Sequence, residues 1–252
     1  KAGIAAAKNG NENESINFFK RTPTLSAEGW MWLGYSYYKI GDLPSSINAL
    51  DESLQLDRLP FAYNLLAVIY RQQKNWAAER DALENQLRLD PKGGDVYTYY
   101  RLGLLLTVLE PEQALTNLML ATSLDPEFDP AVQTLRAALN LSATQPDASQ
   151  QMVTIGRALG LVQEWDLSLA AFEKAIALDA KNAGAWAWLG EAKQHTGGDG
   201  RAELDRAVAL DPTSVIIRAL RGLYWNRQGK YSQMLAEYLL AAEYEPTNPA
   251  WQ

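Results

Sequence analysis

The residue best suited to catalysis is a single histidine. His195 is the only histidine in the chain, and it stands between Gln194 and Thr196 at the end of an expected helix. Because imidazole interacts favourably with a helix C-terminus, a capping or solvated role is favoured over catalysis. No catalytic triad and no set of three metal ligands can be drawn around it. We therefore expect a chain that is not an enzyme and holds no metal.

Two stretches that contain glycine can be compared with phosphate-binding loops. Residues 197–200 read Gly-Gly-Asp-Gly, and residues 229–231 read Gly-Lys-Tyr. A phosphate-binding loop follows a strand and carries Lys-Ser or Lys-Thr before a helix, and neither stretch has that context. Both are expected to be turns, and no cofactor is expected.

Composition narrows the class of partner. The net charge is −7 with a pI near 4.9, whereas a nucleic-acid-binding surface needs a basic stripe, so nucleic acid is not expected as a partner. No run of 18 apolar residues is present, which predicts no membrane insertion within this chain. The absence of cysteine excludes disulfides and leaves the compartment open.

A repeat of about 34 residues organises the chain. One marker, a large residue followed by a small one, recurs at spacings of 33, 36, 53, 34 and 32 residues in Leu33-Gly34, Leu66-Ala67, Leu102-Gly103, Ile155-Gly156, Leu189-Gly190 and Arg221-Gly222. A second marker, an acidic residue that usually precedes proline, recurs with the same period at residues 90, 125, 179, 211 and 245. Both spacings lengthen by roughly one helix and a turn between residues 102 and 179, so an extra helix is expected there.

Each repeat has the pattern of two helices. Apolar and small residues from Trp165 to Leu178 follow the three-and-four spacing of one helix face, and a second apolar face begins at Ala183. The earlier unit that begins at Trp30 reads W-x2-L-G-x2-Y. The chain thus resembles the tetratricopeptide repeat (TPR) family. The resemblance implies an all-α fold, an α/α superhelical solenoid of about seven helix-turn-helix repeats plus one extra helix.

The resemblance also implies a division of the chain. We expect an N-terminal array over residues 1–128, whose first repeat is truncated, and a C-terminal array over 147–248. The irregular helix and its loop occupy 129–146, with the helix from Pro130 to about Ser142. Residues 249–252 resemble the start of a further repeat, as expected of a piece of a longer protein.

In the TPR family the first helices of successive repeats line a concave groove. Carried onto this chain, the register implies a partner-binding groove formed in the first half by Met31, Tyr35, Tyr38, Phe61, Asn64, Arg71, Tyr97, Tyr100 and Leu104. Aromatic enrichment of this kind is typical of interface cores, although packing between the layers is the alternative for some of the tyrosines. The second half contributes less distinctive residues, namely Val153, Arg157, Ala187, Glu191, Ala219, Leu223 and Asn226.

These residues predict a noncatalytic scaffold that binds a protein or peptide along the groove, with Arg71 and Asn64 fixing its orientation. The carboxylate clamp of chaperone-binding TPR members is not expected, because Met31 and Tyr35 occupy positions that would need Lys and Asn. Two alternatives remain. One is a regulatory or positioning region of a larger enzyme such as a glycosyltransferase, and the other is a structural subunit of a larger assembly.

Overall fold

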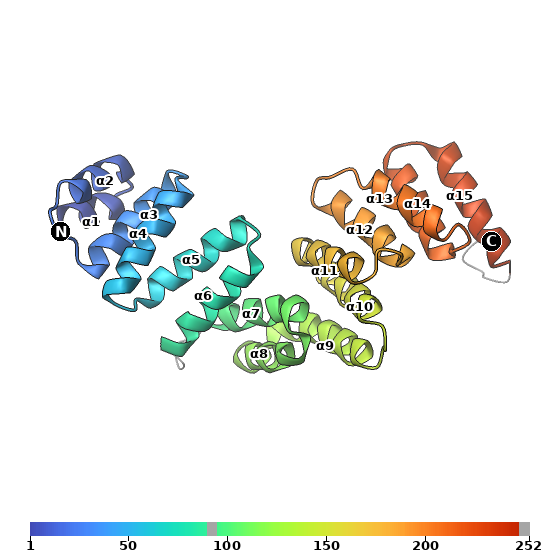
Figure 1. The fold of residues 1–252 in the computed structure, drawn as a ribbon, viewed down its shortest axis with the longest axis horizontal. Coiled ribbons are helices and arrows are strands. Elements are labelled where there is room, and N and C mark those ends of the chain that lie inside the picture. The colour runs from blue at the N-terminus through green and yellow to red at the C-terminus, as the bar shows by residue number, and fades with distance from the viewer. Residues whose placement is uncertain (90–94, 247–252) are drawn as a thin grey trace. The chain divides into compact units, whose positions relative to one another are not determined.

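The described part of the chain is helical throughout. The computed structural model describes residues 1–89 and 95–246, and within these ranges it contains fifteen α-helices and no strand (Figure 1). The helices are α1 (Ala2–Lys8), α2 (Glu12–Lys20), α3 (Ala27–Lys39), α4 (Leu43–Leu56), α5 (Pro60–Gln72), α6 (Trp76–Leu89), α7 (Val96–Leu109), α8 (Pro111–Leu124), α9 (Asp129–Ala143), α10 (Ala148–Leu161), α11 (Trp165–Leu178), α12 (Ala183–His195), α13 (Arg201–Leu210), α14 (Val215–Arg227) and α15 (Tyr231–Tyr244). A short 3-10 helix, Pro126–Phe128, precedes α9.

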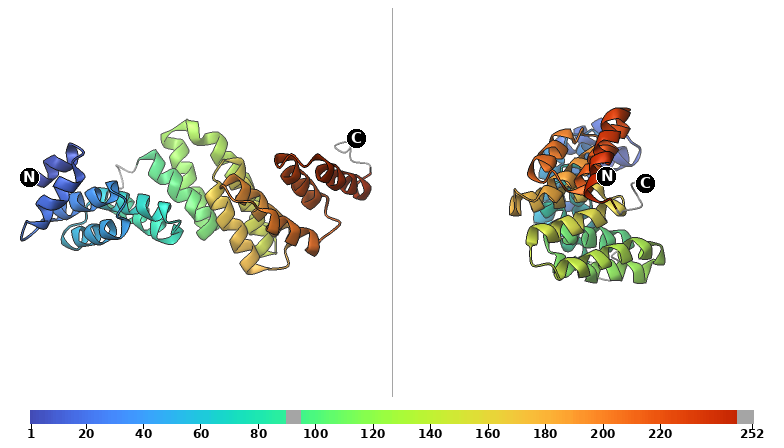
Figure 2. Two further views of the ribbon diagram at one scale, coloured as in Figure 1. Left: turned by 90° about the horizontal axis from the view of Figure 1, so that it is seen from above. Right: turned by 90° about the vertical axis from the view of Figure 1, so that its right-hand side faces the viewer.

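Consecutive helices form hairpins. Contacts join α1 to α2, α3 to α4, α5 to α6, α10 to α11, α12 to α13 and α14 to α15, and two further views show the same hairpins (Figure 2). The helix α9 is left single and packs against both α8 and α10. With α7 and α8 as the remaining consecutive pair, the element order gives seven pairs and one extra helix, which confirms the all-α repeat architecture expected from the sequence.

The large-small marker of the sequence lies where two helices of a pair approach most closely. A Cβ atom on Gly156 of α10 would lie 2.6 Å from the ring of Phe172 on α11, so only glycine fits. The same two helices are joined by the Ser168 hydroxyl, which donates to the Gly156 carbonyl at 2.7 Å. Ser46 and Gly34 repeat this bond at 2.7 Å in the α3–α4 pair. The close approach is thus fixed by packing and by a hydrogen bond.

The contacts divide the chain into two compact units, Lys1–Leu105 and Leu106–Gln252, hereafter unit 1 and unit 2. The core of unit 1 includes Phe19 and Leu33, and that of unit 2 includes Leu204 and Ile217. The division of compact units lies within α7. The arrays 1–128 and 147–248 proposed from the sequence are defined instead by the position of the single helix, and they stay a prediction.

Candidate functional site: an aromatic surface on α3 and α5

The first helices of two neighbouring pairs lie side by side in unit 1. The helix α3 begins after Ser26, whose hydroxyl accepts a hydrogen bond from the Gly29 N–H at 3.2 Å. The helix α5 begins at Pro60, in the first-turn position where a missing N–H costs nothing. The two helices are in contact and bury Leu33 and Ile69 on their inner faces. Their other faces remain available for aromatic side chains.

Three aromatic rings gather across these two helices. The centroids of Trp32 and Tyr35 on α3 are 5.5 Å apart, with the rings edge to face. Phe61 of α5 lies 6.4 Å from Trp32 and 6.3 Å from Tyr35. Contacts of this geometry stabilise aromatic clusters by about 0.5–1.5 kcal/mol for each pair beyond area burial. Phe61 is nevertheless 46% exposed, so the cluster presents an apolar ring to solvent.

A polar margin extends the cluster along α5. Tyr38 on α3 accepts a hydrogen bond from the Gln72 amide at 3.1 Å, which joins the ends of the two helices. Asn64, Val68 and Arg71 follow Phe61 at three- and four-residue intervals and therefore share its side of α5. Asn64 is half-buried, whereas Val68 and Arg71 are exposed. We call the set Trp32, Tyr35, Tyr38, Phe61, Asn64, Val68, Arg71 and Gln72 the α3–α5 aromatic surface.

The burial of two expected groove residues corrects the sequence prediction. Met31 is 8% exposed and Leu104 is 1% exposed, so both side chains belong to the packed interior. Tyr97 is 69% exposed and Tyr100 is half-buried, and both lie on α7 outside the α3–α5 aromatic surface. A partner could reach Tyr97 without unfolding anything, but not Met31 or Leu104. The binding role of the exposed and half-buried residues stays a prediction.

Sequence reasoning missed Trp32. The repeat register assigns the tryptophan of the W-x2-L-G-x2-Y pattern to Trp30, which packs on the core of unit 1. Trp32 instead lies between Tyr35 and Phe61, and the Lys8 ammonium lies 5.4 Å from its ring centroid. The three-residue interval from Trp32 to Tyr35 places both rings on one side of α3, and that interval was the available signal.

A family model for the tetratricopeptide repeat matches residues 31–94, the stretch that contains every residue of the α3–α5 aromatic surface. Residues 31–94 are thus similar to the tetratricopeptide repeat family, and the paired helices of the described chain have the arrangement expected of such repeats. No curated protein sequence matches it. The TPR fold suggests a protein-interaction scaffold, because stacked repeats form extended binding surfaces.

Solved structures with a similar fold include MamA, at 18% identity and a TM-score of 0.45 over 71% of this chain and 88% of that one. YrrB, titled a TPR protein with an unusual peptide-binding site, is 18% identical with a TM-score of 0.38 over 86% of this chain and 96% of its own. A tetratricopeptide repeat protein from Parabacteroides merdae is 12% identical with a TM-score of 0.44 over 99% and 93% of the two chains.

The side chains of His195, Glu191 and Arg227 contact one another or a neighbouring ring in unit 2. The ring of His195 stacks on Trp165 with centroids 3.6 Å apart, and its Nε2 lies 3.2 Å from a Glu191 carboxylate oxygen. The two terminal guanidinium nitrogens of Arg227, Nη1 and Nη2, donate to Glu191 at 2.7 and 2.6 Å. Burial raises the pKa of Glu191, but the hydrogen bonds and charges of Arg227 and His195 outweigh it, so this pKa lies below its ordinary value of 4.5.

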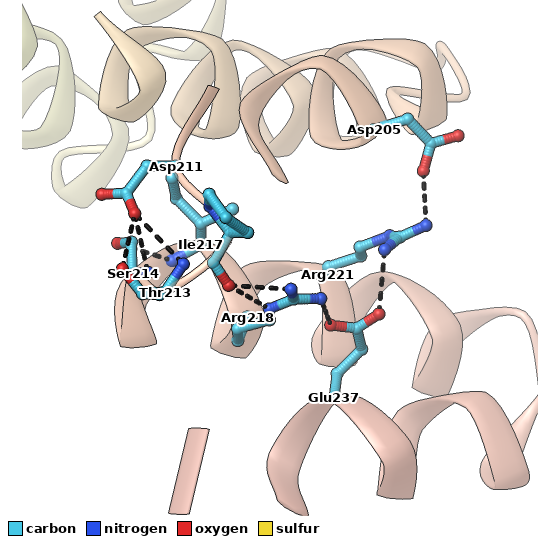
Figure 3. Close-up of polar contacts among 9 residues, drawn as sticks. Asp205, Asp211, Thr213, Ser214, Ile217, Arg218, Arg221 and Glu237 are labelled. Atoms are coloured by element: carbon cyan, nitrogen blue, oxygen red, sulfur yellow. Dashed lines mark hydrogen bonds and ion pairs between the residues drawn. The ribbon is translucent and has the colours of Figure 1, made fainter. Parts of the chain in front are cut away.

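A second ion cluster explains an irregular repeat. Arg218 and Arg221 of α14 stand where the TPR pattern has Trp and Leu, and both donate to the buried carboxylate of Glu237 on α15 at 3.0 Å (Figure 3). Arg221 also donates to Asp205 on α13 at 2.7 Å, and Arg218 donates to the Pro212 carbonyl at 2.9 and 2.7 Å. These bonds satisfy charges that replace the usual apolar contact. We call this set the Glu237 cluster.

Within the described ranges, no group of three or more His, Asp or Glu side chains is placed to hold a metal ion. In the same ranges, no helix has both the length and the apolar character needed to cross a membrane.

Proposed function

We propose that this TPR protein is a noncatalytic scaffold whose α3–α5 aromatic surface binds a partner protein as an extended or helical segment. The observation that carries the proposal is the exposure of Phe61, which remains 46% accessible although it belongs to a ring cluster with Trp32 and Tyr35. A large ring held in place by other rings loses little conformational freedom on binding, and such residues dominate interface energetics.

The margin of the surface suits a peptide backbone. Asn64 offers both a donor and an acceptor, and Arg71 offers donors to a carbonyl or a carboxylate, so these two would fix the direction of the bound segment. The net charge of −7 continues to disfavour nucleic acid as the partner.

The test begins with peptides selected from a displayed random library on the immobilised whole chain, followed by affinity measurements on the selected peptides. Phe61→Ser removes the exposed ring, and a hot-spot ring is worth about 2 kcal/mol or more, so binding should weaken about 30-fold. Tyr231→Ser is the matched control, because Tyr231 is an exposed ring on α15 of unit 2 at 65% exposure.

Phe61→Ser loses two ring contacts, worth about 1–3 kcal/mol together, so the affinities are compared at a temperature where circular dichroism shows both variants fully folded. If every selected peptide binds Phe61→Ser and Tyr231→Ser with equal affinity, the α3–α5 aromatic surface is not the binding site and the proposal fails.

A further inference from the structure

Unit 2 contains a small apolar pocket between α10, α11 and α12. Its volume is about 220 Å³, and its walls include Trp165 and Phe172 of α11 and Trp188 of α12. Pockets for drug-sized ligands usually exceed about 300 Å³, so this one suits a single side chain. It was not visible in the sequence, where the second half of the chain carried the less distinctive groove residues.

The wall formed by Trp165 is held from two directions. The indole N–H donates to the Gln163 side chain at 3.1 Å, and the ring stacks on His195 with an interplanar angle of 2°. Gly160 on α10 leaves room for the ring, because a Cβ there would lie 2.8 Å from Trp165 Cζ3. The pocket is therefore open and shaped before a ligand arrives, which lowers the entropy cost of binding.

A guanidinium group stands at the edge of the pocket. Arg157 of α10 is exposed and lines the pocket, and its guanidinium carbon lies 4.8 Å from the centroid of Trp188. The ring of Phe172, which is 1% exposed, lies 6.4 Å from Trp188 and supports it from within. No hydrogen bond or ion pair links Arg157 to any other residue of the described chain. A planar cation oriented by an aromatic ring, with its donors unused, is suited to a carboxylate.

We propose that this pocket binds a leucine or aromatic side chain of a partner protein, with an Asp or Glu residue next to it pairing with Arg157. The apolar walls select the side chain, and the guanidinium selects the acidic neighbour and disfavours a basic one. The site lies in unit 2 and shares no residue with the α3–α5 aromatic surface, so the two proposals stand or fall separately.

The first experiment uses two small probes on the whole 15N-labelled chain. The probes are 3-phenylpropionate, which has a phenyl ring and a carboxylate, and its uncharged counterpart 3-phenylpropionamide. The readout is the NMR shift of the Trp165 and Trp188 indole N–H signals, assigned with Trp165→Phe and Trp188→Phe. Both probes should shift these signals saturably, and the acid should bind about threefold to fivefold more tightly, as expected for one solvent-accessible ion pair.

Arg157→Gln is the decisive variant. It removes the charge of an exposed side chain, so the fold should be intact, and the acid should then bind no more tightly than the amide. Arg206→Gln, a change at an exposed arginine on α13 that does not line the pocket, should retain the preference for the acid. The assignment of the pocket is wrong if neither probe shifts the indole signals saturably. It is also wrong if Arg157→Gln still binds the acid more tightly than the amide.

A peptide arm separates a partner segment from a free organic acid. A blocked hexapeptide with Phe-Glu at its centre should shift the same indole signals and bind several-fold more tightly than its Phe-Gln counterpart, again only while Arg157 is present. If 3-phenylpropionate binds and the Phe-Glu peptide does not, the pocket takes small carboxylic acids and the proposal of a protein partner is wrong.

Discussion

The Glu237 cluster makes a quantitative prediction about local stability. Replacing Glu237 by Gln keeps the size of the side chain but removes its charge from between Arg218 and Arg221. The Glu237 side chain is 9% exposed, and those of its partners Arg218 and Arg221 are 10% and 22% exposed, so water screens the cluster only in part. Breaking a buried pair costs about 3–5 kcal/mol. The amide can still accept one hydrogen bond and Arg221 is partly wet, so we expect a loss of about 2–3 kcal/mol.

The loss should be local, because each pair of a repeat protein is stabilised mainly by its neighbours. Amide hydrogen exchange followed by mass spectrometry reports opening of α13, α14 and α15 separately from the rest. A loss of 2 kcal/mol corresponds to exchange about 30-fold faster in these helices. Glu243→Gln, at an exposed position of the same helix, is the matched control.

Two outcomes would refute this reasoning. Exchange in Glu237→Gln at the wild-type rate would show that the cluster contributes nothing to stability. Equal acceleration in Glu243→Gln would show that loss of any carboxylate from α15 has the same effect, and that the contacts with the two arginines are not responsible.

Two further predictions concern acid stability and helix packing. Because the pKa of Glu191 is lowered in the folded chain, its stabilising contribution is complete above about pH 4.5 and is lost as the pH falls through the folded-state value. The free energy of unfolding, measured by urea titration at several pH values, should therefore fall more steeply between pH 5 and pH 3 in the wild type than in Arg227→Gln. An equal fall in both proteins would contradict the pairing of Glu191 with Arg227. Gly156→Ala would place a Cβ 2.6 Å from the buried ring of Phe172 and should cost about 1–3 kcal/mol, seen as a lower thermal midpoint. Gly184→Ala, where a Cβ meets only a side-chain oxygen at 3.3 Å, should leave the midpoint nearly unchanged, and a matching fall there would show that close packing is not the cause.

The helices could be predicted from the sequence because each pair repeats the same packing requirement. The large-small marker locates the closest approach, and a break in its spacing located the single helix, expected from Pro130 to about Ser142 and found at Asp129–Ala143. The close approach depends on residues within one pair, and the position of the single helix depends on a break in a regular period. Both kinds of information can be read directly from the sequence.

The surfaces could be predicted only in part, because exposure depends on what neighbouring helices cover. The register placed Tyr35 and Phe61 on one side of the first helices, where they are in contact. It also placed Met31 there, although the fold buries this side chain. The pocket in unit 2 depends on Gly160, whose missing side chain makes room for the Trp165 ring that forms one wall, and a search for aromatic enrichment does not detect an absent side chain.

The Glu237 cluster distinguishes the last helix pairs of the described chain from the other, similar pairs. In a protein of similar repeats, a helix can pack against a non-native neighbour during folding, because the apolar contacts of that pairing resemble the native ones. Arg221 bridges Asp205 on the helix before it and Glu237 on the helix after it, so mispairing would leave the buried Glu237 carboxylate without its two arginine partners. The contacts of Arg221 with Asp205 and Glu237 therefore favour the native pairing of α13, α14 and α15 over docking against another repeat.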